Sequence, residues 1–172
     1  ELNEKLQSYY MDLDLFKYFT KTQYLYNGLA SKFFGENGAN ISDEDVQEYV
    51  DANDYMTAKH IRFKTTDDSG AALSDADKAA KKKQAEQVAA QIKAVTDPEK
   101  RVELFDQLME QYNEDTGESS YPHGYCFTSG TMVTEFEDAC KALEPYEVSG
   151  VVESRHGYHV ILRMPIQGYD LV

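Results

Sequence analysis

Basic residues, cysteines and long apolar runs are all scarce in this chain of 172 residues. Lys and Arg number 17 against 31 Asp and Glu, which gives a net charge of −14. Binding to a phosphate backbone requires clustered basic side chains, so we expect no nucleic-acid partner. The one basic run, 78–83, is expected to be a solvated helix face. No apolar run approaches the roughly 20 residues that a membrane span needs, so no span is expected in this segment.

The two cysteines, Cys126 and Cys140, say little about the redox compartment. Free thiols and a disulfide both remain open, because sequence alone does not fix the Cα separation that a disulfide requires. The chain begins at Glu1, with neither an initiator Met nor a signal peptide. We therefore expect it to be a segment of a longer precursor.

Residues 1 to about 34 are predicted to form one long helix. Its apolar residues recur at alternating spacings of four and three, at Leu2, Leu6, Tyr9, Leu13 and Phe16. Glycines at 35 and 38 break the pattern, and Ser42 with Asp45 resembles a capping box for a second helix. Two such helices cannot bury both apolar stripes by themselves. We expect them to contact flanking sequence, clients, or a second copy of the chain in a homodimer.

Strand and helix patterns alternate from residue 57 onward. Asp97 and Pro98 have the N-cap and first-turn positions of a helix, and Thr134 with Glu137 predicts a capping box for a later one. Strands are expected at 58–64, 124–127, 148–152 and 158–164, the last two as a hairpin. The predicted fold class is α+β, a small antiparallel sheet wrapped by helices behind an N-terminal helical segment.

Two of these strands carry a histidine at their centre. His60 lies in Ala58–Lys64, and His159 lies in Gly157–Arg163. Both segments alternate in the manner of strands whose faces meet different environments. If the two strands pair centrally, both imidazoles can lie on one side of the sheet, which is an odd choice for packing alone.

Three blocks resemble the parvulin family of peptidyl-prolyl cis/trans isomerases. They are AKHIRFK at 58–64, GYCFTSGTMVTEFEDACKALEPYEVSGVV at 124–152 and SRHGYHVILR at 154–163. The resemblance runs from about residue 57 to 164, in the family's order. It implies a parvulin-like domain at 56–165, a chaperone-like helical segment at 1–55 and a tail at 166–172. It implies no cofactor.

The resemblance also assigns a substrate pocket. Met132 and Phe136 match the family's pocket for the proline ring, and Phe127 matches the aromatic residue beside it. A strand end, a glycine-containing turn and a helix start can converge on one site. Ordinary core packing is the alternative for Phe127 and Phe136, whereas Met132 lies in a turn after Gly130.

The polar residues of the site are implied in the same way. His60 and His159 match the family's paired histidines, which would support the site geometry through a hydrogen bond between them. Asp115 matches a position that is Asp in many bacterial members, with an electrostatic role near the substrate carbonyl. The alternative for Asp115 is a loop cap. Ser154 falls at a position that bears a hydroxyl group near the histidines.

Two departures from the family pattern affect specificity. Gly124 stands where a leucine often lines the pocket, so Tyr125 is the candidate for that wall. The loop after the first strand reads Thr66-Asp67-Asp68-Ser69-Gly70, whereas phosphate-directed parvulins carry arginines there. We therefore expect no specificity for phosphorylated substrates.

A zinc site is a rival hypothesis. The pairs His123/Cys126 and His156/His159 both have the spacing of metal ligands. They lack the glycines typical of structural zinc knuckles, and His159 alternates within a strand. We therefore expect no metal.

The resemblance implies prolyl isomerisation of unfolded or newly exported polypeptides. The alternative is a chaperone module that binds extended clients with little or no turnover, because Gly124 departs from the pocket pattern. The resemblance to bacterial foldases further implies an extracytoplasmic location, secreted or lipid-anchored.

Overall fold

The computed structural model describes residues 2–36, 39–67, 69–117 and 121–166. The chain divides into two compact units, Glu1–Tyr49 and Val50–Val172, and each is described by itself. Asp68 of the acidic loop and all but the first residue of the expected tail at 166–172 lie outside the described residues. The assignment of a chaperone-like role to 1–55 stays a prediction.

The N-terminal region contains two helices, so the prediction of one continuous helix was wrong. Helix α1 spans Leu2–Ser8, and α2 spans Leu13–Phe34. Tyr10 takes a positive φ of 55° between them. The Asp12 side chain then accepts a hydrogen bond from the Leu15 N–H at 2.8 Å and caps α2. The periodic apolar pattern continues through residues 9–12, so the break between the two helices cannot be recognised from that pattern.

Helix α2 exposes large apolar side chains. Leu6 of α1 is buried, but no residue described in α2 is. The exposed side chains of α2 include Phe16, Phe19, Tyr24, Leu25, Leu29 and Phe33. Within the described residues, none of the helices is both long enough and apolar enough to cross a membrane.

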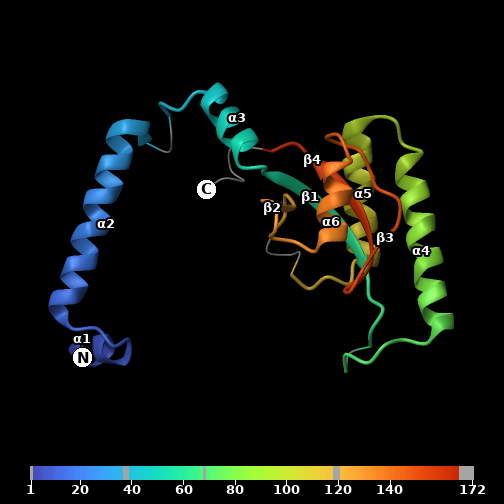
Figure 1. Cartoon of the computed structure of the whole chain (residues 1–172), viewed down its shortest axis with the longest axis horizontal. Coiled ribbons are helices and arrows are strands. Elements are labelled where there is room, and N and C mark those ends of the chain that lie inside the picture. Colours follow the sequence, from blue (N-terminus) through green and yellow to red (C-terminus); the bar gives the residue numbers. More distant parts are fainter. Residues whose placement is uncertain (1, 37–38, 68, 118–120, 167–172) are drawn as a thin grey trace. The chain divides into compact units, whose positions relative to one another are not determined.

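A four-stranded antiparallel sheet forms the centre of the second unit (Figure 1). The strand order is β2-β1-β4-β3, with β1 at Met56–Phe63, β2 at Tyr125–Phe127, β3 at Val152–Ser154 and β4 at Gly157–Met164. The long strands β1 and β4 are central, as the two histidine segments suggested. The hairpin is also present, but its first strand begins at Val152, where the predicted strand 148–152 ends, and Val148 joins the sheet only through a bridge to Leu162. The α+β fold class is confirmed.

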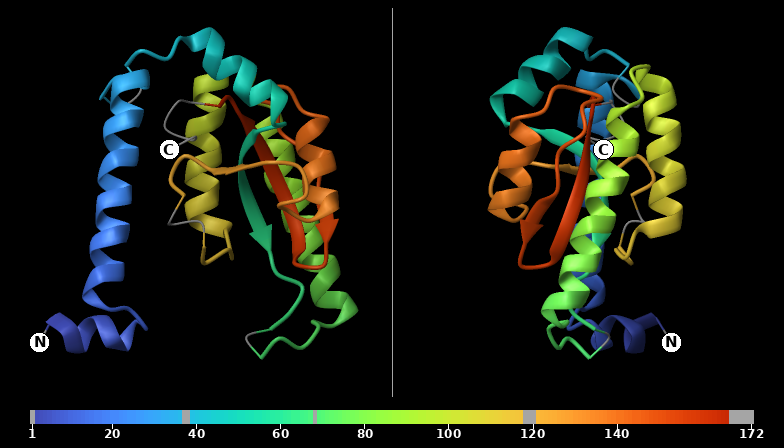
Figure 2. Two further views of the ribbon diagram at one scale, coloured as in Figure 1. Left: turned by 60° about the vertical axis from the view of Figure 1, so that its left-hand side comes forward. Right: turned by 90° about the vertical axis from the view of Figure 1, so that its right-hand side faces the viewer.

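Helices cover both faces of this sheet (Figure 2). Helices α4, Asp75–Lys93, and α5, Pro98–Tyr112, pack on the face that carries Ile61, Phe63 and Val160. Helix α6, Thr134–Lys141, covers the other face, where Phe136 packs against Ala58 and Ile161. Burial of these apolar side chains holds the layers together, and the α6 face carries the candidate site.

Two of the three predicted helix caps are confirmed. The Asp97 side chain accepts the Lys100 N–H at 3.0 Å at the start of α5, where Pro98 takes the first turn. Ser42 Oγ accepts the Asp45 N–H at 3.1 Å at the start of α3, Asp43–Ala52.

The third predicted cap, a capping box of Thr134 with Glu137, was wrong, although α6 does begin at Thr134. Val133 occupies the N-cap position of α6 and makes no side-chain cap. The Glu137 carboxylate instead accepts the backbone N–H groups of Gly130 at 3.0 Å and Met132 at 2.8 Å. Hydrogen bonds from Gly130, opposed by burial, hold the pKa of Glu137 below its usual value. Glu137 therefore fixes the turn that precedes the helix.

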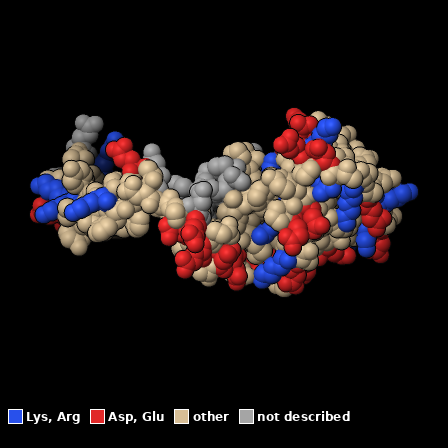
Figure 3. Space-filling view, turned by 90° about the horizontal axis from the view of Figure 1, so that it is seen from above, with Lys and Arg blue, Asp and Glu red and all other residues tan. Residues whose placement is uncertain are grey.

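Charges of both signs are distributed over the surface. On the face seen in Figure 3, Lys and Arg of the larger unit are interspersed with Asp and Glu and form no continuous basic patch. This distribution agrees with the acidic composition of the chain.

Candidate active site

The two histidines lie side by side on the α6 face of the sheet. In the β1–β4 register His60 is opposite Ile161, and His159 is opposite Arg62. The imidazole rings stack with centroids 5.3 Å apart, and their Nδ1 atoms are 3.3 Å apart. Both side chains are buried, with 7% and 3% exposed. The expectation that central pairing brings the imidazoles together is confirmed.

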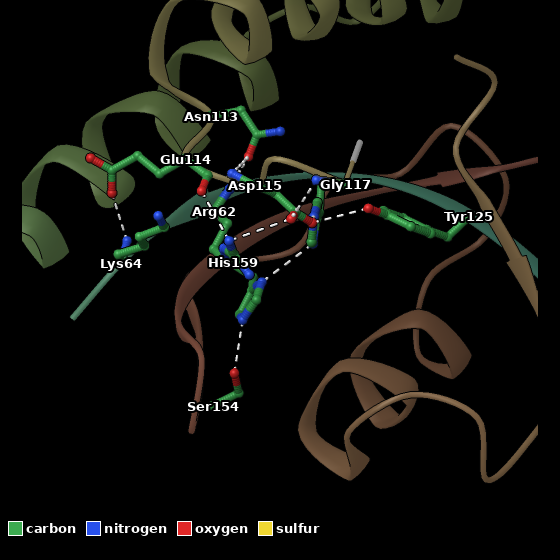
Figure 4. A network of polar contacts seen from close by, with 10 residues as sticks. Arg62, Lys64, Asn113, Glu114, Asp115, Gly117, Tyr125, Ser154 and His159 are labelled. Carbon is green, nitrogen blue, oxygen red and sulfur yellow. Dashed lines mark hydrogen bonds and ion pairs between the residues drawn. The ribbon is translucent and has the colours of Figure 1, made fainter. Parts of the chain in front are cut away.

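The loop after α5 reaches the site by pairing with the free part of the β1 edge. Strand β2 pairs only with residues 56–58 of β1, which leaves the edge beyond it open. There Asn113 Oδ1 accepts the Arg62 N–H at 2.9 Å, and the Glu114 N–H donates to the Arg62 carbonyl at 2.9 Å. Glu114 Oε2 accepts the Lys64 N–H at 2.7 Å (Figure 4). These bonds deliver Asp115, the next residue, to His60.

Asp115 is both a loop cap and a member of the site. Its Oδ1 accepts the Gly117 N–H at 3.2 Å and lies 3.4 Å from Arg62 Nη2. Its Oδ2 is 2.7 Å from His60 Nε2 and accepts the Tyr125 hydroxyl at 3.0 Å. The bond from His60, reinforced by Gly117 and the charge of Arg62, holds the pKa of Asp115 well below its usual range despite burial. The carboxylate is therefore ionised at neutral pH.

The ionised Asp115 and the burial of His159 constrain the protonation of the two histidines. An ionised Asp115 can only accept, so His60 carries its proton on Nε2. Burial lowers the pKa of His159 to about 3, so this imidazole is neutral. Nδ1 of His159 and Nδ1 of His60 lie 3.3 Å apart, and the tautomers of the two rings decide which of them donates.

Ser154 contacts the second ring nitrogen of His159. Its Oγ accepts the His156 N–H at 3.1 Å and lies within hydrogen-bond distance of His159 Nε2, at 2.8 Å. The polar array thus runs from Ser154 through both histidines to the carboxylate of Asp115. Every imidazole nitrogen in it has a partner, so the rings are fixed in position.

A cavity of about 660 Å³ opens over this polar array. Its lining includes the apolar side chains of Met132 and Phe136 and the polar side chains of His60, His159 and Asp115. Arg62, Tyr125 and Arg155 are also among the lining residues.

Two residues assigned to the site from the sequence support the cavity from behind. Phe127 is buried, and its ring lies 5.8 Å from that of Phe136. Ser154 reaches the cavity through His159. Neither is among the residues that line the cavity. The structure thus brings all seven assigned residues together, five at the cavity and two behind it.

Gly124 is required by the close approach of two strands. Its φ is +102°, and a Cβ atom there would lie 2.8 Å from the Ala58 carbonyl oxygen. A leucine would therefore clash with the backbone of β1. Tyr125 forms part of the cavity wall, as the sequence suggested, but the bond from its hydroxyl to Asp115 was not anticipated.

The zinc hypothesis finds no support in the part of the chain that the structure describes. No three His, Cys, Asp or Glu side chains there come together as a metal site. Both ring nitrogens of His159 are within hydrogen-bond distance of other side chains. Cys126 and Cys140, both within the described residues, are not joined in a disulfide, and burial raises the pKa of Cys140 to about 12.

The low pKa of His159 predicts a loss of stability in acid. The folded value of about 3 lies below the ordinary 6.5, so the unfolded chain binds this proton first as the pH falls. Between about pH 6.5 and 3 the free energy of unfolding should fall by up to about 1.4 kcal/mol per pH unit from this group. Denaturant unfolding across this range measures the slope.

The slope should be shallower in His159→Asn than in the unmodified chain. His123→Gln, which removes an exposed histidine, is the control. An equal slope in His159→Asn would contradict the assignment of His159 as neutral in the folded state.

Comparisons with known proteins bear on the same region. Residues 60–164 match the family described as rotamase, PPIC-type PPIASE domain. The foldase protein PrsA of Oceanobacillus iheyensis is 34% identical over 124 residues, which cover 70% of this chain and 33% of that protein. Foldase protein PrsA 1 of Bacillus cereus is 52% identical over 59 residues, 33% of this chain and 20% of that protein.

A solved structure supports the fold. A SurA-like chaperone of Campylobacter jejuni has a TM-score of 0.51 at 22% identity, over 88% of this chain and 58% of that one. The chain spans a third or less of the length of each of these two PrsA foldases. The match to the PPIC-type domain nevertheless covers more than half of the chain, from His60 in β1 to the end of β4. The chain therefore belongs to the family of PPIC-type peptidyl-prolyl isomerase domains, the parvulins.

Proposed function

We propose that the second unit, 50–172, catalyses cis/trans isomerisation of prolyl bonds in unfolded or newly exported polypeptides. The observation that carries this proposal is the cavity, whose lining combines apolar side chains with an ionised carboxylate held by a fixed polar array. Membership of the PPIC-type family supports it.

The reaction needs neither a nucleophile nor a metal. Its barrier is the loss of amide resonance, about 18–20 kcal/mol, and uncatalysed prolyl bonds interconvert over roughly tens to hundreds of seconds. Resonance places negative charge on the carbonyl oxygen, and water stabilises that charge. A catalyst must therefore grip the proline ring, displace this water and favour the twisted amide over the planar one.

The residues of the cavity fit these tasks. Met132 and Phe136 offer an apolar surface for the ring. The Asp115 carboxylate would repel a carbonyl oxygen that carries resonance charge, and twisting the amide removes part of that charge. The anion thus raises the energy of the planar state more than that of the twisted state. The histidines hold the carboxylate in place and transfer no proton.

A proline-containing tetrapeptide assay, coupled to a conformer-selective protease, tests this function. We expect isomerisation above the uncatalysed rate and no faster turnover of a phosphoserine-proline peptide than of its unmodified twin. The net charge of −14 opposes a phosphate, and the Arg62 guanidinium is already engaged by the Glu114 carbonyl and Asp115. A clear preference for the phosphopeptide would contradict the expected specificity, and the absence of any turnover would refute the function.

Binding of unfolded clients is the second candidate function, favoured by the exposed apolar side chains of α2. A chain shortened to 43–172 keeps all of α3 and the whole second unit. We expect it to isomerise tetrapeptides like the full chain but to lose suppression of aggregation of an unfolded protein. Loss of both activities would show that α1 and α2 belong to the catalytic unit.

We further propose an extracytoplasmic location, secreted or lipid-anchored. The support is the similarity to the PrsA foldases and the likeness to SurA-like chaperones of Campylobacter jejuni, one of which is described as periplasmic. Fractionation of cells that express the full precursor tests the location. A homodimer through α1 and α2 remains a prediction, which sedimentation of the full chain and of 43–172 would test.

A further inference from the structure

Tyr125 occupies a defined place at the edge of the cavity. It is the first residue of β2 and pairs with Ala58, so its side chain emerges on the same face as His60. The preceding Gly124 is held against the Ala58 carbonyl and has no side chain, which leaves the wall to Tyr125. The phenol ring lines the cavity and meets the His60 ring edge-on at 5.5 Å between centroids.

The hydroxyl of Tyr125 connects this edge to the loop that carries Asp115. It donates to Asp115 Oδ2 at 3.0 Å, the same oxygen that accepts the His60 N–H at 2.7 Å. Asp115 belongs to no helix or strand, so the direction of its carboxylate depends on such bonds. Figure 4 shows the hydroxyl of Tyr125 directed at Asp115, whose other oxygen accepts the Gly117 N–H.

A phenol hydroxyl is a suitable donor for this position. It is uncharged, so it restrains the carboxylate without neutralising it. The carboxylate keeps the negative charge that acts on the substrate carbonyl in the proposed mechanism. His60 and Tyr125 approach one oxygen from two different strands, and two donors restrict rotation of the carboxyl group more than one does.

We propose that Tyr125 is a positioning residue of the isomerase with two separable roles. Its hydroxyl fixes the Asp115 carboxylate and thereby sustains kcat, whereas its ring forms the cavity wall and sustains substrate binding. The proposal rests on the isomerase function proposed above. It applies to the full chain and needs no cofactor.

Two substitutions separate the roles in the full chain, with the tetrapeptide assay as readout. Tyr125→Phe removes only the hydroxyl, and we expect kcat to fall about tenfold, the scale of a hydrogen bond to a charged group, with KM unchanged. Tyr125→Leu removes the ring as well, so KM should also rise several-fold. Tyr121→Phe is the matched control, because the Tyr121 ring lies 4.6 Å from that of Tyr125 but does not line the cavity.

A double-mutant cycle shows whether the hydroxyl acts through Asp115. In the Asp115→Asn background, Tyr125→Phe should cause little further loss of kcat, because the carboxylate that it positions is already absent. Additive losses would overturn the proposal, as would an unchanged kcat in Tyr125→Phe of an active wild type. Thermal unfolding of each variant separates this effect from a loss of fold, which would lower the apparent kcat by reducing the folded fraction and leave KM unchanged. Absence of isomerase activity in the wild type is a different result, which refutes the proposed function and this proposal with it.

Discussion

Replacement of Asp115 by Asn should lower kcat/KM about a hundredfold, equal to about 2.7 kcal/mol of transition-state stabilisation. The substitution removes the negative charge and keeps the shape of the side chain. Asn can still accept hydrogen bonds from His60 and Tyr125, so the loop should stay in place. The loss should appear in kcat, because the charge distinguishes the twisted amide from the planar one and contributes little to holding the proline ring.

Asp106→Asn provides the matched control for this prediction. Asp106 pairs with the buried Lys59 at 2.8 Å and does not line the cavity. Its replacement removes the same charge and should reduce stability. It should leave kcat/KM within about twofold, because the Asp106 charge lies outside the cavity, where solvent and salt screen it. Similar kinetic losses in both variants would indicate a general charge effect. Full activity in Asp115→Asn would show that the carboxylate is only a loop cap.

The features predicted well from the sequence depend on local patterns. Alternation around His60 and His159 identified the two central strands, and their pairing places both rings on one face. The Asp97-Pro98 start of α5 is equally local, since the capping side chain and its amide are three residues apart. Such patterns can be recognised because they involve only residues close together in the sequence.

The way in which Asp115 reaches His60 could not be predicted from the residues alone. It depends on Asn113 and Glu114, whose side chains bond to the backbone of Arg62 in β1 and of Lys64 just after it, about 50 residues earlier in the chain. Only the family resemblance pointed to Asp115. Glu137 was misassigned because a threonine followed three residues later by a glutamate fits a helix cap, whereas the carboxylate is held by amides of the preceding turn. A local motif does not show whether the Glu137 carboxylate will accept hydrogen bonds from the first turn of its own helix or from the turn before it.

The substrate pocket provides the second large expected effect. Met132→Ala together with Phe136→Ala should lower kcat/KM by at least about tenfold and up to about a hundredfold, because the proline ring loses its apolar contacts. The two residues differ in their contribution to the fold. Met132 is half-buried in a turn, whereas Phe136 is 3% exposed and packs with Phe127 and Ile161. Phe136→Ala should therefore also lower the free energy of unfolding by about 3–5 kcal/mol.

Met132→Ala alone separates catalysis from stability. It should raise KM several-fold with little change in the thermal midpoint, because the Glu137 carboxylate holds the backbone of the turn and not the methionine side chain. Met109→Ala in α5 is the matched control, since Met109 packs on the opposite face of the sheet and its loss should reduce stability without changing KM. The pocket assignment would be refuted by unchanged kinetics in a folded Met132→Ala chain, or by an equal rise of KM in Met109→Ala. Met132 borders the cavity and is only half-buried. The KM of the Met132→Ala variant is therefore the most direct measure of whether this cavity receives proline.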